Sequence, residues 1–74
     1  MVGVMNGRQF IARIRKLGRA RGLDVRFVAS KGPGSHGTLF VGSLKTTVKD
    51  RKKEIGKGLL VKMLSDLQIG REEL

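Results

Sequence analysis

The sequence predicts an α+β protein in which two helices pack on one face of a three-stranded antiparallel sheet. Apolar residues recur at helical spacing near both ends of the chain, and three short segments between them are rich in β-branched and aromatic residues. A Gly-Ser pair between the last two of these segments suits a hairpin turn. The expected order is therefore α-β-β-β-α. Because each helix has one apolar stripe, both are expected to cover the same side of the sheet and to leave the other side to solvent or a partner.

The first helix is expected over residues 6–22. Asn6 is a favourable N-cap, and Gln9 three residues later completes a capping-box pattern. The apolar stripe consists of Phe10, Ile11, Ile14 and Leu17. The opposite side carries Arg8, Arg15 and Arg19. Gly22 fits the left-handed residue that ends a helix.

Three strands are expected next, over residues 23–30, 38–41 and 44–48, with Gly42 and Ser43 as the two-residue turn of a hairpin. In the first strand, Val25 and Phe27 share one face. The second helix is expected over residues 56–70, with Gly70 as its stop. Its buried stripe consists of Leu59, Leu60, Met63, Leu64 and Leu67.

The length of 74 residues fits one small domain over residues 1–74, with 1–5 and 71–74 expected to be frayed. The chain has no cysteine, which excludes disulfides and thiolate metal sites and is compatible with a cytoplasmic location. Its apolar runs are only a few residues long, so neither a membrane span nor a signal peptide is expected.

Positive charge is the strongest global feature. Sixteen Lys and Arg against six Asp and Glu give a net charge of +10, and residues 1–23 contain no acid at all. This density favours a polyanionic partner, of which nucleic acid is the commonest. An acidic protein partner and a merely solvated basic surface are the alternatives.

The loop "KGPGSHG", residues 31–37, combines the groups that RNA cleavage requires. Gly32, Gly34 and Gly37 can adopt a left-handed backbone and turn their amides toward an anion. An imidazole such as that of His36 can remove the proton of a 2′-hydroxyl or protonate a leaving oxygen. The amides and Lys31 can stabilise charge on the phosphate. The alternative is an ordinary connecting loop with a surface histidine, since the chain has no second His, no Tyr and no Cys as a further acid or base.

The motif "GSHGTLF", the basic strand "LKTTVKD" and the segment "KKEIGKGLLVKMLSDLQI" together resemble the HicA family of mRNA-cleaving toxins from bacterial toxin–antitoxin pairs. In that family a Gly-Ser-His motif opens the second strand, and Gly34, Ser35 and His36 match it. The likeness extends over roughly residues 6–70. The sequence departs from many members at Gly37, where they have a second His or another polar residue.

This resemblance implies a double-stranded-RNA-binding-like fold and a messenger-RNA-cleaving ribonuclease with His36 as its catalytic residue. Because acid–base chemistry by a histidine needs no metal and the sequence offers no metal-ligand cluster, no metal or cofactor is expected. It also implies neutralisation by a HicB-type antitoxin that covers the active face, with a larger toxin–antitoxin complex possible. The expected substrate-binding residues are Lys31, Gly34, Ser35, Gly37, Lys45, Lys49, Lys52, Lys53 and Lys57. The first-helix arginines are secondary candidates. A non-catalytic RNA-binding module with the same fold is the alternative function.

Overall fold

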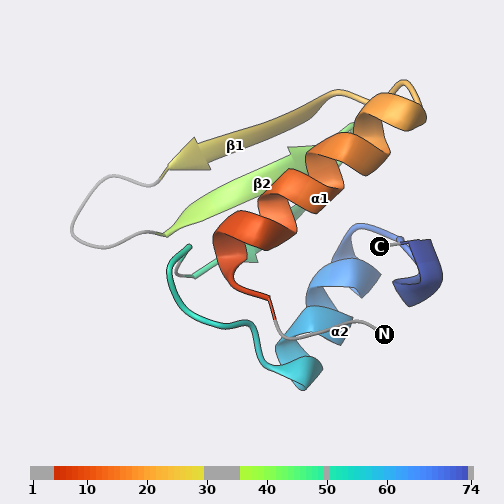
Figure 1. Ribbon diagram of the computed structural model, residues 1–74. Coiled ribbons are helices and arrows are strands. Elements are labelled where there is room, and N and C mark those ends of the chain that lie inside the picture. The colour runs from red at the N-terminus through yellow and green to blue at the C-terminus, as the bar shows by residue number, and fades with distance from the viewer. Residues whose placement is uncertain (1–4, 30–35, 50, 74) are drawn as a thin grey trace.

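The computed structural model describes residues 5–29, 36–49 and 51–73. Its elements follow in the order α1 (Gly7–Ala20), β1 (Val25–Ala29), β2 (Gly37–Val41), β3 (Leu44–Val48), α2 (Lys57–Asp66) and a short 3-10 helix, η1 (Arg71–Glu73). Both helices lie on the same side of one antiparallel sheet with the strand order β1-β2-β3 (Figure 1). The predicted α-β-β-β-α order and the α+β class are confirmed.

The sheet alternates between a buried face and an open face. Leu39 and Val41 of β2 and Val48 of β3 are buried beneath the helices. The residues between them point to the other side, because successive side chains of a strand alternate. There the register aligns Arg26, Phe40 and Lys45 in one row across the three strands. The open face is therefore partly cationic and partly apolar.

The core is aliphatic apart from one phenylalanine and lies between the sheet and the two helices. Its most deeply buried side chains are Phe10, Ile14, Leu39, Met63, Leu64 and Val48. Burial of a side chain of this size contributes about 1.5–3 kcal/mol, so these few residues supply much of the driving force for a fold of this size.

Both ends of α1 follow the sequence prediction. The Asn6 side chain accepts from the Gln9 amide at 2.8 Å, and the Gln9 side chain accepts from the Asn6 amide at 2.9 Å, which completes the capping box. At the other end Gly22 has φ +71°, and the Leu23 amide donates to the Gly18 carbonyl at 2.8 Å. This is the Schellman arrangement that a left-handed glycine permits.

The predicted end of the second helix at Gly70 is wrong, because α2 ends at Asp66. The left-handed residue here is Gln68, with φ 55°, and the Ile69 amide donates to the Leu64 carbonyl at 2.9 Å. Ile69 is buried and belongs to the same core cluster as Leu64. The turn is thus held by a hydrophobic contact rather than by a glycine.

Both ends of the described chain contact the rest of the fold. Met5 is only 4% exposed, and its carbonyl accepts from the Ile55 amide at 2.8 Å. Two further bonds join the first amides of α1, those of Gly7 and Arg8, to the carbonyls of Lys53 and Arg51. Residues 71–73 form η1, where Glu73 pairs with Arg21. Residues 1–4 and 74 lie outside the described part, and the expectation of frayed ends stays a prediction.

No helix within the described residues is both long enough and apolar enough to cross a membrane.

Candidate nucleic-acid interface

His36 lies at the start of β2, where it immediately precedes the strand, and its side chain is exposed. Gly37 pairs with Val48, so extending the β2–β3 register by one residue places His36 across from Lys49. The basic segment 51–53 begins two residues after Lys49. The candidate catalytic residue thus lies at the end of the sheet from which this basic segment leaves.

Much of the predicted phosphate-binding loop cannot be placed. Lys31, Gly34 and Ser35 lie outside the described residues, as do Gly32 and Pro33. Their predicted roles remain expectations from the sequence.

Gly37 has a different environment from the one expected. It belongs to β2, is buried, and does not have the left-handed backbone predicted for it. A Cβ atom at this position would overlap Cζ of Phe27 and would lie 2.8 Å from the Val28 carbonyl oxygen. Glycine is therefore required here because the Phe27 ring occupies the space of a side chain.

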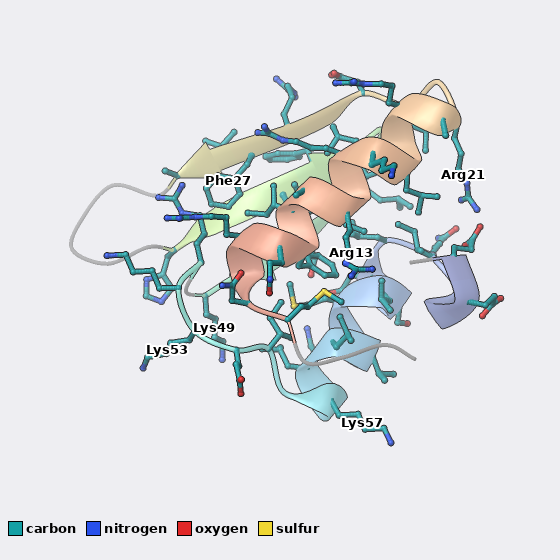
Figure 2. The ribbon with its side chains drawn as sticks, viewed as in Figure 1. Arg13, Arg21, Phe27, Lys49, Lys53 and Lys57 are labelled. Atoms are coloured by element: carbon teal, nitrogen blue, oxygen red, sulfur yellow. The ribbon has the colours of Figure 1, made fainter. Side chains whose placement is uncertain are left out.

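The five predicted lysines in the described part of the chain fall into three places. Lys49, Lys52 and Lys53 are exposed in the stretch that follows β3, near the end of the sheet that His36 occupies. Lys45 is exposed on the open face opposite Phe40, whose ring lies 5.6 Å from the Arg26 guanidinium carbon. Lys57, at the start of α2, points away from Lys49 and Lys53 (Figure 2).

A cationic groove between α1 and β1 is a further feature, which sequence reasoning did not find. It has a volume of about 490 Å³. We call it the α1–β1 groove, and it is lined by Arg8, Ile11, Ala12, Arg15, Lys16, Arg19, Phe27 and Arg51. The sequence placed three of these arginines on the polar side of the helix but gave no sign that Phe27 and Arg51 lie beside them.

Arg51 and Phe27 form the end of the α1–β1 groove nearest the start of α1. The guanidinium carbon of Arg51 lies 5.1 Å from the centre of the Phe27 ring, within the range of a cation–π contact. The Arg51 Nε atom is buried and has no hydrogen-bond partner. Leaving a buried cationic donor unsatisfied is unfavourable. A hydrogen-bond acceptor at this end of the groove would therefore be favourable.

No carboxylate within the described residues forms an ion pair with a cation that lines the α1–β1 groove. The ion pairs in the described part of the chain are Arg21–Glu73, Arg26–Asp24 and Lys62–Asp66. None of them involves a residue that lines the groove. Five cations along one hollow therefore create a strongly positive potential.

The described part of the chain has no group of three His, Asp or Glu residues that could hold a metal ion. The chain matches none of the protein-family models, curated proteins or solved structures with which it was compared. The resemblance to the HicA family therefore rests on the three sequence segments quoted above and on the order of the elements.

Proposed function

We propose that this protein is a ribonuclease that cleaves messenger RNA, with His36 transferring the proton, in the manner of the HicA toxins that its sequence resembles. The observation that supports this proposal most strongly is the position of His36. It is exposed at the start of β2, across from Lys49 in the extended register and beside the basic segment 51–53.

The reaction needs few groups. The neutral imidazole of His36 removes the proton of a ribose 2′-hydroxyl, and the 2′-oxygen attacks the adjacent phosphorus. The bond from phosphorus to the 5′-oxygen breaks, and that oxygen takes up a proton from the His36 imidazolium formed in the first step or from water. The products are a 2′,3′-cyclic phosphate and a 5′-hydroxyl. Lys49 and its basic neighbours stabilise the negative charge that develops on the phosphate oxygens. No step in this scheme requires a metal ion or an organic cofactor.

The cleavage test compares wild type with His36→Ala on an end-labelled messenger RNA in the presence of EDTA. Removal of a general acid or base costs on the order of 10²–10⁴ in rate, so the variant should cut at least about 100-fold more slowly while binding RNA normally. Thr47→Ala is a matched control, because Thr47 is exposed on the neighbouring strand. Cleavage by His36→Ala at the wild-type rate would refute the catalytic assignment.

The second candidate is an RNA-binding module without catalysis. It is favoured by the spread of cations along α1, well beyond the surroundings of His36. If wild type and His36→Ala both bind the messenger RNA and neither cuts it, this second function is the correct one.

The same proposal includes an acidic HicB-type antitoxin that covers the active face. Its test is co-expression of this chain with the product of an adjacent reading frame. The expected result is relief of growth arrest together with co-purification of the two proteins. Expression of this chain alone at high yield and without growth arrest would contradict the role as a toxin.

A further inference from the structure

The α1–β1 groove has a chemistry that distinguishes among possible ligands. Its lining consists of four arginines, one lysine and three apolar residues. These side chains donate hydrogen bonds or offer apolar surface, and none of them carries a hydrogen-bond acceptor. A peptide in the groove would bring backbone N–H donors that its lining side chains cannot satisfy. A phosphodiester chain brings acceptor oxygens, negative charge and base faces, all of which this lining matches.

The α1–β1 groove runs along most of α1. Arg8 and Arg19 are eleven residues apart on one helix, which places them about 16 Å apart along its axis. The hollow is bounded by α1 on one side and by Phe27 of β1 on the other. A strand lying in it would contact cations on α1 and could stack its bases on guanidinium planes.

The α1–β1 groove also leads toward His36. The Phe27 ring, which lines the groove, packs directly over Gly37, the residue after His36. Arg51 stacks on the same ring and follows Lys49 by two residues. A strand that leaves the groove at Arg51 would reach the end of the sheet at which Lys49 and His36 lie. It would pass round that end, because the alternation of β2 and β3 places both residues on the open face.

We infer that the α1–β1 groove is a binding track for single-stranded RNA, which holds the part of the substrate that lies outside the cleavage point. The connection to His36 rests on the proposed function, whereas the binding itself does not. Arg8, Arg15, Arg19 and Arg51 contact phosphates in the groove, and the Arg51–Phe27 pair marks its exit.

The test measures binding of a short fluorescein-labelled single-stranded RNA by anisotropy in the His36→Ala background, so that the probe stays intact. The test variant is Arg15→Ala/Arg19→Ala, and the matched control is Arg13→Ala. Arg13 is also an exposed arginine of α1, but it lies on the side toward α2, away from Phe27 (Figure 2). Circular dichroism confirms that each variant is folded.

We expect the double variant to bind at least about tenfold more weakly, since each charge-assisted bond contributes about that much. The slope of log K against log salt should become shallower by about 1.4, or about 0.7 for each lost phosphate contact on a single strand. Arg13→Ala should leave both quantities nearly unchanged.

Three outcomes would overturn the inference. The first is equal RNA affinity in the double variant and wild type. The second is an equal loss of affinity in Arg13→Ala, which would indicate a general effect of charge. The third is a loss of binding to an acidic protein partner with RNA affinity intact. Failure of the proposed catalysis is a separate result, because it appears as uncut messenger RNA with wild type, which leaves the anisotropy data as they stand. Cleavage by His36→Ala would appear as a shortened probe on a denaturing gel and would also be recorded separately from affinity.

Discussion

α1 and α2 pack on the same face of the sheet, yet their charged residues differ in whether they are paired. In α2, Lys62 lies 3.5 Å from Asp66, and the same carboxylate accepts from the buried hydroxyl of Thr46 at 2.9 Å. The charges of α2 thus help to attach it to β3. In α1, the cations that line the α1–β1 groove have no carboxylate partner within the described residues.

This difference separates what stabilises the fold from what is available to a ligand. Unneutralised charges of one sign repel each other and lower the stability of a folded protein. A helix that keeps several of them along one hollow is better explained by a polyanionic ligand than by stability. We therefore expect substitutions in α2 to act on stability and substitutions on the grooved side of α1 to act on binding.

The largest effect is expected for Leu64→Ala. Leu64 is 2% exposed, so its truncation leaves a cavity and should lower the free energy of unfolding by about 2–5 kcal/mol. Urea denaturation measures this change. Val61→Ala, at a 44% exposed position of the same helix, is the control and should change stability by about 0.5 kcal/mol or less. A marked loss of RNA affinity in folded Leu64→Ala would contradict the expectation that α2 acts on stability and the grooved side of α1 on binding.

An intermediate effect is expected for Gly37→Ala, where the α1–β1 groove and the core meet. The new methyl group would overlap the Phe27 ring, and overpacking of this kind costs about 1–3 kcal/mol in unfolding free energy. Because Phe27 also lines the groove, RNA affinity should fall as well. The control is Gly58→Ala in α2, where no atom lies within 4 Å of the new Cβ. Unchanged stability of Gly37→Ala would show that the ring moves aside without cost.

The smallest effect is expected at the end of α2. Gln68 adopts the left-handed backbone that glycine adopts with less strain, so Gln68→Gly should raise the unfolding free energy by about 0.5–1 kcal/mol. Thermal denaturation detects a change of this size. The matched substitution at the end of α1 is Gly22→Ala, which should lower stability by a similar amount. Changes of the same sign at both sites would contradict this account of the two helix ends.

The sequence predicted those features that depend on near neighbours along the chain. The capping box at Asn6 and Gln9, the left-handed Gly22 and the hairpin turn at Gly42 are all formed as expected. In contrast, α2 ends at Asp66 because Ile69 returns to the core, which is a tertiary contact that a glycine pattern does not reveal.

The candidate site also combines features that the sequence predicted with features that depend on tertiary contacts. The exposure of His36 agrees with its place in a glycine-rich sequence. The role of Gly37 could not be predicted, because it depends on a ring ten residues earlier in a paired strand. The α1–β1 groove was missed for the same reason, since α1, β1 and the segment after β3 each contribute part of its lining.

The three backbone hydrogen bonds that join residues 5–8 to residues 51–55 have a consequence for how the molecule is assembled. These bonds close a loop of more than forty residues, and closing it costs conformational entropy. The amides of Gly7 and Arg8 find their acceptors only when that cost has been offset. During synthesis, a nascent chain that has not yet reached Arg51 lacks the backbone carbonyls that accept from the first amides of α1. It also lacks the guanidinium that stacks on Phe27. The end of the α1–β1 groove formed by Arg51 and Phe27 is therefore completed late, after all three strands have been translated.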